Sequence, residues 1–375
     1  MPSAEIITIG TEILLGEIVD TNTRHIALTL RDLGVDLYRT VTIGDNVERI
    51  ASAIRDSMQH AEIIITTGGL GPTVDDPTRE AIAKAAGVDT EFRQELWEQV
   101  VTAVSRYGRK PAENQKRQAI VPKGAIGIQN PVGTAPAFIV ENERNSVISL
   151  PGVPNEMEHI LHESIVPYLQ KRFKLHDVIK VRVLHTSGLG EGVIDEKIDD
   201  LETLANPTVG LAAHTGVVDI RIAAKAESEA KANTMIADIE NLIRERIGDA
   251  VFGVDEDKLE DVVLNLVNQR GWKLVAIESG LNGLLSRTLP HVASFPDLTA
   301  DSLMEALRTA RKDSKADVAL GVTIHPEDRS ADMALITPSG EKKHRITYGG
   351  PPRSLPQWAV NLALNWLRTI AKETV

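Results

Sequence analysis

Residues 66–78 read TTGGLGPTVDDPT, and this stretch is the clearest indication of the fold of the first part of the chain. It follows an apolar run that ends at Ile65 and precedes a helical pattern at 79–86. A buried strand therefore leads through a glycine-rich turn into the N-terminus of a helix. Such a turn presents backbone N–H groups and the positive end of a helix dipole to an anion, usually a phosphate. The simpler alternative is a tight turn that needs positive φ and binds no ligand.

Two neighbouring carboxylates, Asp75 and Asp76, lie on the same loop. They would repel a bare phosphate, so we expect a divalent cation between the carboxylates and the phosphate. Asp76 also precedes Pro77, and proline is favoured at the first position of a helix, so Asp76 is a candidate N-cap as well. The two interpretations are compatible, and the loop predicts a site for phosphate and metal.

The first part of the chain alternates predicted strands with predicted helices. Buried strands at 6–9, 36–41 and 63–65 are separated by helical patterns at 22–33 and 47–58. Strands that alternate with helices of this length indicate a parallel sheet with helices on both faces. The predicted fold class is therefore α/β.

Three loops follow strands of this predicted sheet. They carry Gly10 with Glu12, then Asp45, and then the glycine-rich stretch that begins at Gly68. Because ligands of parallel sheets bind at the carboxyl ends of the strands, we expect the three loops to converge on one cleft. Taken singly, Glu12 is a solvated loop carboxylate and Asp45 forms an Asx turn. Asn22 either caps the next helix or binds a ligand hydroxyl.

The remainder of the chain predicts one more helical segment and two smaller units. Residues 90–119 are predicted to be helical, and a hairpin at 137–150 precedes a helix that ends near 172. A small α+β unit spans about 177–253, and an α/β unit spans about 257–375. We place the domain boundaries at 1–173, 174–254 and 255–375.

Composition limits the class of protein. The 375 residues are 42% hydrophobic and 25% charged, which is ordinary for a globular chain of two or three domains. The chain has no cysteine, which excludes disulfides, thiolate metal sites and cysteine nucleophiles. No apolar run approaches the roughly 18–20 residues of a membrane span. The N-terminus lacks a secretory signal, so we expect a cytoplasmic protein with no membrane partner.

Charge argues against a nucleic-acid partner. The formal net charge is −12, and no basic stripe is found along the chain. The loop GLGEG at 188–192 loosely resembles the glycine loop of RNA-binding KH modules, but it carries Glu191 and has no basic neighbours. We therefore expect no binding of nucleic acid.

Six motifs together resemble the CinA family, the competence/damage-inducible protein A group. The resemblance covers the N-terminal half of the chain, and the motifs are specific. They read GTEILLG (10–16), TNT (21–23), GD (44–45), GGLGPTVDDPT (68–78), GTAP (133–136) and LPGVPNEM (150–157).

This resemblance implies both a fold and an activity. It implies a molybdopterin-binding-like N-terminal domain, a KH-like middle domain and an α/β C-terminal domain. It further implies an ADP-ribose pyrophosphatase that needs a divalent metal (Mg, Mn or Co) and yields AMP and ribose 5-phosphate. A homodimer is usual for the family.

The third unit resembles the family's nicotinamide-mononucleotide deamidase domain but differs from it in the motifs of the active site. The family reads Glu-Ser-Cys-Thr-Gly-Gly after a strand, whereas this chain has ESGLNG at 278–283. A glycine-rich segment with a Tyr and a Lys is missing, and the later motif Thr-Gly-Ile-Ala-Gly-Pro is replaced by TIHP at 323–326. Serine hydrolysis needs an activating base and oxyanion donors. We therefore expect a retained fold without deamidase activity, in which the candidate nucleophile Ser279 is a helix cap.

The predicted reaction uses the N-terminal site. The pyrophosphate is expected on the N–H groups of residues 68–71, and Lys116 is expected to stabilise charge in the transition state. The cluster of Lys110, Lys116 and Arg117 has two interpretations, contact with phosphate or a solvated helix face. The predicted metal ligands are Asp45 and Asp76, and the predicted catalytic residues are Asp75, Asp76 and Lys116. The predicted substrate-binding residues are Gly10, Glu12, Asn22, Gly68, Gly69, Gly71, Thr73, Thr78, Asn114, Gly133, Thr134, Pro151 and Gly152.

Three alternative functions remain open at this point. The first is binding of molybdopterin or a nucleotide at the same loop, with adenylyl transfer. The second is intact deamidation at Ser279. The third is a non-catalytic scaffold that acts through the C-terminal domain and a protein partner.

Overall fold

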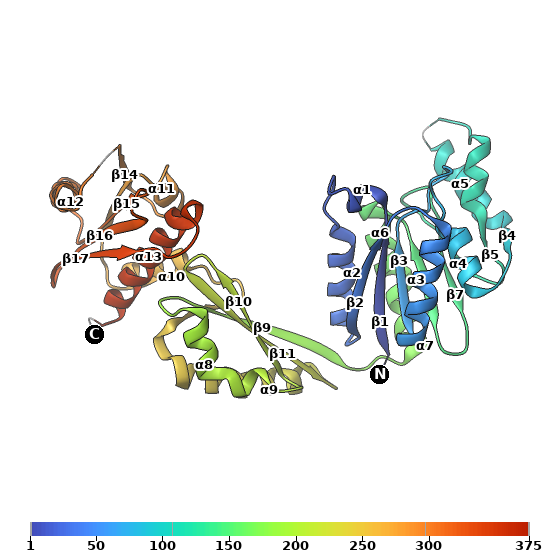
Figure 1. Cartoon of the computed structure of the whole chain (residues 1–375), viewed down its shortest axis with the longest axis horizontal. Coiled ribbons are helices and arrows are strands. Elements are labelled where there is room, and N and C mark those ends of the chain that lie inside the picture. Colours follow the sequence, from blue (N-terminus) through green and yellow to red (C-terminus); the bar gives the residue numbers. More distant parts are fainter. Residues whose placement is uncertain (1, 107, 297, 374–375) are drawn as a thin grey trace. The chain divides into compact units, whose positions relative to one another are not determined.

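The structure, a computed structural model, describes residues 2–106, 108–296 and 298–373. It divides into two compact units, residues 1–180 with 225–232, and residues 181–224 with 233–375 (Figure 1). The first unit holds the predicted first domain, and most of the predicted second and third domains lie in the second unit. Each unit is described by itself below.

A six-stranded sheet forms the centre of the first unit, with the strand order β2-β1-β3-β8-β7-β6. Neighbouring strands are parallel from β2 through β1 and β3 to β8. Strand β7 is antiparallel to both of its neighbours, β8 and β6. The predicted α/β class and the hairpin before residue 150 are thus confirmed. The strands are β1 (Ser3–Ile9), β2 (Asp36–Ile43), β3 (Ile63–Thr67), β6 (Ile126–Ile128), β7 (Ala137–Glu141) and β8 (Ser146–Leu150).

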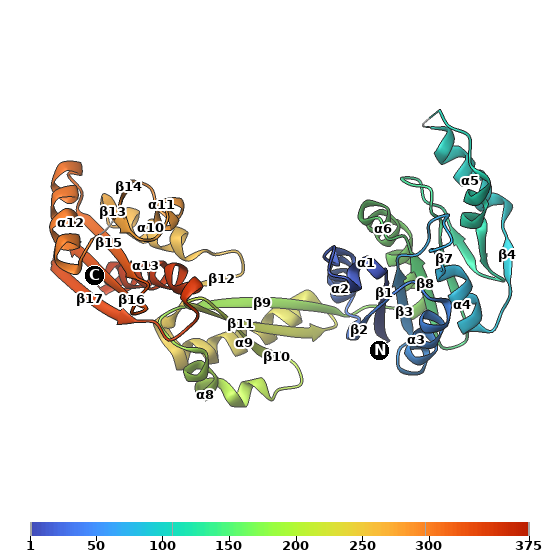
Figure 2. The ribbon, with the colours of Figure 1, turned by 45° about the horizontal axis from the view of Figure 1, so that its top comes forward.

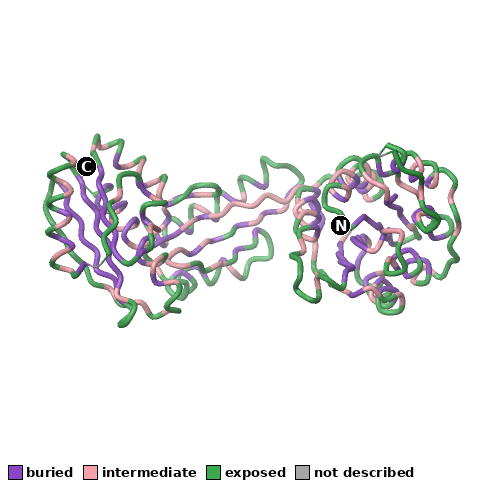
Figure 3. The backbone as a smooth tube through the Cα atoms, turned by 90° about the horizontal axis from the view of Figure 1, so that it is seen from above, coloured by how far each residue is buried: buried purple, intermediate pink, exposed green. Residues whose placement is uncertain are grey.

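Both faces of this sheet are buried, because successive side chains of one strand point to opposite faces. Ile6 packs into one core and its neighbour Ile7 into the other, and both are fully buried. Strands buried on both sides read as continuous apolar runs, which explains the run before the glycine loop. Figure 3 shows this buried interior in purple.

Helices cover the two faces of the sheet (Figures 1 and 2). One core contains residues of α2, α6 and α7, and the other contains residues of α3, α4 and α5. The helical elements of this unit are α1 (Thr11–Leu14), α2 (Thr21–Asp32), α3 (Val47–His60), α4 (Thr78–Ala86), α5 (Gln94–Ser105), η1 (Glu113–Ala119), α6 (Pro154–Ile160), the π-helical η2 (Leu161–Ile165) and α7 (Val166–Phe173).

The long helix predicted at 90–119 was wrong. The described part of this segment holds the short strand β4 (Thr90–Phe92), α5 and the 3-10 helix η1. Strand β4 pairs with β5 (Ile120–Pro122). Gly108 adopts a φ of 68° and Pro111 has no backbone N–H, so a helix cannot continue through this stretch. Asn114 and Lys116 therefore lie on η1 and not on the face of a long helix.

The middle of the chain forms a four-stranded sheet, in the order β10-β11-β9-β12, with two helices. Its small α+β character agrees with the prediction for this segment. The elements are β9 (Val178–Thr186), α8 (Glu191–Glu202), β10 (Thr208–His214), β11 (Val217–Ala226), α9 (Glu229–Ile247), η3 (Gly248–Ala250) and β12 (Val251–Val254).

A five-stranded sheet, in the order β14-β13-β15-β16-β17, forms the C-terminal part. Strand β13 is parallel to both of its neighbours, β14 and β15. Strand β16 is antiparallel to both of its neighbours, β15 and β17. No helix in the described residues is long and apolar enough to cross a bilayer. The elements are α10 (Leu259–Gln269), β13 (Leu274–Ser279), α11 (Leu284–Thr288), β14 (Val292–Phe295), α12 (Ala300–Ser314), β15 (Val318–His325), β16 (Ser330–Thr337), β17 (Gly340–Thr347), η4 (Pro352–Ser354) and α13 (Leu355–Glu373).

Candidate functional site

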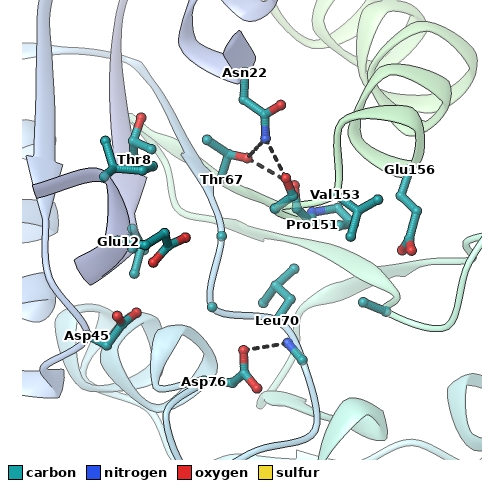
Figure 4. A pocket seen from close by; sticks show the side chains of 18 of the residues that line it. Thr8, Glu12, Asn22, Asp45, Thr67, Leu70, Asp76, Pro151, Val153 and Glu156 are labelled. Carbon is teal, nitrogen blue, oxygen red and sulfur yellow. Dashed lines mark hydrogen bonds between the residues drawn. The ribbon is translucent and has the colours of Figure 1, made fainter. Parts of the chain in front are cut away.

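A cavity of about 600 Å³ lies at the carboxyl ends of the parallel strands of the first unit (Figure 4). The loops after β1, β2, β3 and β8 all contribute to it, together with the end of η1. Its volume is in the range of small-molecule sites. The loops that were expected to converge therefore line one cavity.

Most of the predicted site residues line this cavity. Thr78, Asn114, Lys116 and Gly133 are not among its lining residues. The predicted residues that line it are Gly10, Glu12, Asn22, Asp45, Gly68, Gly69, Gly71, Thr73, Asp75, Asp76, Thr134, Pro151 and Gly152.

The four residues outside the cavity have other contacts. Thr78 is buried behind the glycine loop, and its hydroxyl donates to the carbonyl oxygen of Gly68 at 2.9 Å. Gly133 precedes a lining residue, and its carbonyl accepts from the Gln99 side chain. Asn114 and Lys116 are exposed on η1, and the Lys116 ammonium pairs with Glu113 at 2.7 Å. This geometry favours the solvated-face interpretation of Lys116.

The glycine loop needs glycine at two adjacent positions. Gly68 and Gly69 have φ values of 104° and 65°. A Cβ on Gly68 would lie 2.0 Å from the carbonyl oxygen of Ile9, and one on Gly69 would lie 2.2 Å from the Thr78 hydroxyl oxygen. Side chains at either position would therefore clash with the loop's own support as well as strain the backbone.

Asp76 holds the glycine loop in its conformation. Its Oδ1 accepts from the N–H of Gly71 at 2.8 Å, and its Oδ2 accepts from the N–H and the hydroxyl of Thr73 at 2.8 and 2.6 Å. The N-cap of α4 is Pro77, so the capping interpretation of Asp76 was wrong. Both of its oxygens are engaged within the loop, which leaves Asp76 less free to ligate a metal than the sequence suggested.

The loop amides available to an anion are also fewer than expected. The Gly71 N–H donates to Asp76, and the Gly68 N–H donates to the Leu150 carbonyl oxygen at 3.1 Å. Within the described chain, the N–H groups of Gly69 and Leu70 have no acceptor. These two amides are the N–H groups of the stretch 68–71 that have no acceptor in the described chain.

Sequence reasoning missed a buried cation beneath the loop. Arg79 is 4% exposed, and its guanidinium donates to the carbonyl oxygens of Leu70 at 2.6 Å and Gly71 at 3.2 Å. Burial lowers the Arg79 pKa to about 10, against an opposing effect of the Asp76 charge. The group therefore stays positive at neutral pH and favours negative charge on the loop. Its position at the start of α4 was the only signal in the sequence.

The lining of the cavity is strongly acidic. Six carboxylates line it, and no Lys, Arg or His is found among its described lining residues. Both oxygens of Asp20 accept hydrogen bonds from neighbours in α2 and β1, and Oδ2 of Asp45 accepts from the N–H and hydroxyl of Thr11. The Glu12 carboxylate and Oδ1 of Asp45 receive no hydrogen bond from the described chain. Figure 4 shows these two side chains on the same side of the cavity.

Glu156 is a lining carboxylate that the sequence showed only as part of a motif. Its carboxylate accepts from the Asn130 side-chain amide and points into the cavity (Figure 4). Burial raises the Glu156 pKa, although hydrogen bonds from Asn130 and the Ala135 backbone oppose the shift. A raised pKa in a cavity is typical of groups that exchange protons.

Two buried amides of the lining, Asn22 and Gln118, each have one polar atom without a partner among the described residues. These atoms are Oδ1 of Asn22 and Oε1 of Gln118. Asn22 was predicted as a site residue. Gln118 was missed, because only the ending of η1 at the cavity brings it there.

In the C-terminal part of the chain, Ser279 does not cap a helix. It is the last residue of β13 and is 3% exposed, whereas the N-cap of α11 is Gly283. The carboxylate of Glu278 accepts from the N–H of Leu285 at 2.9 Å and so satisfies the start of α11 in its place. The expectation of a capping role for Ser279 was wrong.

The fold and the cavity define an α/β protein of several parts, with a cavity at the carboxyl edge of its N-terminal parallel sheet. Residues 5–171 match a family described as probable molybdopterin binding domain, and residues 181–253 match the damage-inducible protein CinA KH domain.

Relatives extend over most of the chain. A protein of Caldanaerobacter subterraneus subsp. tengcongensis named as competence-damage inducible is 40% identical over 288 residues, which cover 77% of this chain and 69% of the relative. One of Clostridium botulinum (strain Loch Maree / Type A3) is 38% identical and covers 81% of this chain and 73% of its own length. The chain belongs to the CinA family of competence-damage inducible proteins, as its motifs predicted.

Solved structures are also similar to parts of the chain. One, described as the protein CinA with unknown function from Thermoplasma acidophilum, is 34% identical, with a TM-score of 0.40. The match covers 46% of this chain and 97% of that chain.

Proposed function

We propose that the N-terminal domain hydrolyses ADP-ribose to AMP and ribose 5-phosphate with the help of a divalent cation. One observation carries the proposal: a single cavity combines the free amides of Gly69 and Leu70 with acidic side chains and with no basic residue in its described lining. The amides suit a phosphate, and the carboxylates require a cation between themselves and it. A pyrophosphate with bound metal satisfies both requirements.

The chain's own residues bind and orient the pyrophosphate in this proposal. The N–H groups of Gly69 and Leu70 donate to phosphate oxygens, and Arg79 beneath them adds positive charge without entering the cavity. Asp76 holds the loop in the conformation in which these two amides have no acceptor in the described chain. Preorganised donors of this kind stabilise charge that develops during phosphoryl transfer.

The residues present fit a divalent cation that is also held by the substrate. No group of three or more His, Asp or Glu residues in the described chain forms a metal cage. Mg²⁺ at phosphate sites takes one or two carboxylates and completes its shell with phosphate oxygens and water. Glu12 and Asp45, which keep unengaged oxygens, would hold it, and when bound it would neutralise phosphate charge and lower the pKa of water.

Hydrolysis also needs a group that accepts a proton from water. In this proposal Glu156 takes this role, which is supported by its side chain lining the cavity and by burial raising its pKa. Water then adds to one phosphorus atom and the bridging P–O bond to the other phosphate breaks. The products are AMP and ribose 5-phosphate, and the proton of the water is accepted at Glu156.

The test is release of AMP from ADP-ribose with Mg²⁺, Mn²⁺ or Co²⁺, and with none of them. Ammonia release from nicotinamide mononucleotide is measured in parallel. Metal-dependent AMP without ammonia supports the proposal. Ammonia without AMP would move the activity to the C-terminal domain, and silence in both would refute hydrolysis at either site.

A second candidate function is binding of a pterin or nucleotide without hydrolysis. The family description that matches residues 5–171 favours it, and it would use the same cavity. Thermal shift with molybdopterin, ATP and ADP-ribose separates the two. A shift with molybdopterin or ATP but no AMP from ADP-ribose favours this second candidate.

A further inference from the structure

The Glu156 carboxylate is held by the loop of residues 130–135, which follows β6 and is called the Glu156 socket below. Its Oε2 accepts a hydrogen bond from the side-chain amide of Asn130, and the Ala135 backbone also bonds to it. Glu156 extends from α6 and lines the cavity (Figure 4). Asn130 is not a lining residue and is 1% exposed. The socket therefore contacts the carboxylate from behind the cavity wall.

The orientation of the Asn130 amide is fixed by three backbone groups. Its Oδ1 accepts from the N–H groups of Val132 at 3.2 Å and Gly133 at 2.9 Å, and an N–H can only donate. Its nitrogen donates to the carbonyl oxygen of Ala135 at 3.0 Å, which can only accept. The second hydrogen of the amide is therefore the one that Glu156 receives. Asn130 can only donate to this carboxylate.

The socket is also anchored on α5. The Gln99 side chain accepts from the N–H of Asn130 at 3.2 Å, and it donates to the carbonyl oxygens of Asn130 at 3.2 Å and Gly133 at 3.3 Å. Both the backbone and the side chain of Asn130 are thus fully hydrogen-bonded. A reactive group is held in place best by neighbours that are themselves fixed in this way.

Gly133 leaves the space that the carboxylate occupies. A Cβ on Gly133 would lie 2.0 Å from the Cδ of Glu156, and 2.2 and 2.3 Å from its two carboxylate oxygens. The φ of Gly133 is not in the left-handed region, so its backbone conformation does not itself require glycine. The requirement for glycine at this position therefore comes from the carboxylate of Glu156.

The simpler interpretation is that Glu156 only braces the loop. A brace has no need of open space, yet Glu156 is half-buried and lines the cavity. Burial raises the pKa of Glu156, and the hydrogen bond from Asn130 opposes this rise. The socket thus keeps an ionisable carboxyl at the cavity wall under two opposing influences, which suits a group that exchanges protons.

Neighbouring charges do not account for the state of Glu156, which forms no ion pair within the described chain. On its own helix, Glu158 pairs with His25 of α2 at 3.4 Å. On α5, Arg106 donates to the carbonyl oxygen of Pro131 at 2.7 Å. No charged residue is among the causes of the Glu156 pKa shift. The other charged residues that line the cavity are Glu12, Asp20, Asp45, Asp75 and Asp76.

We propose that Asn130 and Gly133 are positioning residues, which hold the Glu156 carboxylate at the cavity wall in the orientation from which it accepts the proton of water. The proposal rests on the proposed function, because it takes Glu156 as the proton acceptor of the hydrolysis. Neither residue lines the cavity. Asn130 acts through its hydrogen bond, and Gly133 acts through the space that it leaves.

A double-mutant cycle tests Gly133. Gly133→Ala displaces the carboxylate sterically, and because the Glu156 side chain is flexible, Tm should change little. The kcat for AMP release should fall by about 100-fold with KM nearly unchanged, as in Glu156→Gln. The double variant should be no slower than Glu156→Gln alone, since both changes remove the same function.

The control for this cycle is Gly190→Ala. Gly190 has a φ of −79°, and no atom lies within 4 Å of the added carbon, so AMP release should be unchanged. Wild-type kcat in Gly133→Ala overturns the role of Gly133. A double variant that is slower than Glu156→Gln by the full factor of Gly133→Ala also overturns it, because the methyl group then acts on another part of the loop.

A second experiment measures the Glu156 carboxyl directly, without metal or substrate. Carbon-13 NMR of protein labelled at the glutamate carboxyl carbon follows its titration, and Glu156→Gln identifies its signal. Asn130→Asp keeps the shape of Asn130 but places a second carboxyl beside Glu156, so the Glu156 pKa should rise by about one pH unit or more. Gly133→Ala should lower this pKa toward its ordinary value of 4.5, because the carboxylate leaves the socket.

Asn145→Asp is the matched control for Asn130→Asp. Asn145 is also a buried amide, 4% exposed, and its nitrogen donates to the carbonyl oxygens of Met58 and Ala61. It does not line the cavity, so its replacement should leave the Glu156 pKa unchanged. The acid limb of the kcat profile should move upward in Asn130→Asp by the amount that NMR measures, and stay in place in Asn145→Asp. A Glu156 pKa that is unchanged in both socket variants overturns the proposal.

The remaining outcomes separate this proposal from the hydrolase. Wild-type AMP release by Glu156→Gln overturns the proposal and leaves hydrolysis intact. Absence of AMP release from the wild type refutes hydrolysis, and the NMR titration then decides by itself whether Asn130 and Gly133 position the carboxyl. If Asn130→Asp does not fold, Gly133→Ala decides through both its titration and its cycle with Glu156→Gln.

Discussion

Two glycine turns in this chain have similar local structure but different surroundings. One follows β3 and contains Gly69-Leu70-Gly71, and the other follows β13 and contains Gly280-Leu281-Asn282. Both leucines are 2% exposed and pack into the core of their own domain. In each turn one carboxylate, Asp76 or Glu278, accepts three hydrogen bonds and fixes the local backbone.

The difference lies in where the three donors come from. The donors to Asp76 belong to its own loop, so the loop is held while its outer side remains open to a cavity. The donors to Glu278 come from Leu285 and Ser286 in α11 and from Ser294 in β14. These elements are thereby tied to the end of β13. The first turn therefore borders a cavity, whereas the second turn is connected by hydrogen bonds to α11 and β14.

The largest expected effect comes from the carboxylate that holds the first turn. Asp76→Asn replaces one acceptor by an amide nitrogen, which cannot accept from the N–H of Gly71 or Thr73. AMP release from ADP-ribose should fall by about 100-fold or more, as the loss of preorganised donors predicts. Because these contacts also support the fold, Tm should fall as well.

Two other variants test the same comparison between the turns. Asp75→Asn removes a charge from the same cavity but no hydrogen bond of the loop in the described structure, so its loss of activity should be smaller. Glu278→Gln weakens the equivalent contacts of the C-terminal turn, and it should lower the stability of that part while AMP release is unchanged. Full activity of Asp76→Asn, or inactivity of Glu278→Gln, would contradict the comparison.

A second prediction concerns the glycine that approaches the neighbouring strand. Gly68→Ala places a methyl group 2.0 Å from the Ile9 carbonyl oxygen at a φ of 104°, so the strand or the loop must move. The free energy of unfolding should fall by about 3 kcal/mol. Gly87→Ala is the control, because Gly87 also has positive φ, at 70°, but no atom within 4 Å of the added carbon. It should cost about 1 kcal/mol.

Chemical denaturation of both variants measures this difference. Equal costs would show that backbone strain alone governs the loop. A larger cost at Gly68, with loss of AMP release only there, would show that close contact with β1 sets the position of the amides.

The sequence predicted the fold well where the signal was local. Apolar runs such as the one before Gly68 and the positions of glycines are local properties, and they gave the parallel sheet and the loops along its edge. The segment 90–119 was misread because its composition favours a helix, whereas Gly108 and the pairing of β4 with β5 interrupt it. Pairing between strands is a non-local property that propensity does not report.

The site was predictable in its types of residue but less so in their roles. Asp76 was expected to ligate a metal, yet its oxygens accept bonds from its own loop, and only the folded geometry could show this. Arg79, Gln118 and Glu156 were missed because burial and a neighbouring cavity give them their significance. The burial of a polar side chain and its position at a cavity depend on the folded arrangement, and nothing local in the sequence marks these three residues.

A third prediction tests the carboxylates that remain free. Glu12→Gln removes a charge that no hydrogen bond in the described structure engages, so the fold should be unaffected. The concentration of Mg²⁺ that gives half-maximal AMP release should rise about tenfold, with kcat nearly retained at saturation. Excess EDTA should abolish AMP release from the wild type. Thr21→Ala, a neutral change in the same lining, is the control and should leave the metal requirement unaltered. If Glu12→Gln leaves it unaltered too, Glu12 does not hold the metal.

The smallest expected effect is the pH dependence of stability at Glu156. Burial raises the pKa of this carboxyl above its ordinary value of 4.5, so the folded state retains the proton at pH values where the unfolded chain has lost it. The resulting contribution to stability is fully present below pH 4.5 and is lost as pH rises through the raised pKa. Glu156→Gln cannot ionise, so its Tm relative to the wild type should increase over this window and then level off. Calorimetry from pH 4 to 8 measures the difference, and a Tm difference that is constant across the window would show that the cavity imposes no cost on the ionised carboxylate. The same variant also bears on the comparison of the two glycine turns, because Glu156 lines the cavity beside the first turn and a proton acceptor is needed only where a substrate is converted. If Glu156→Gln loses AMP release and gains stability at neutral pH, Glu156 is a residue that serves the reaction at a cost in stability.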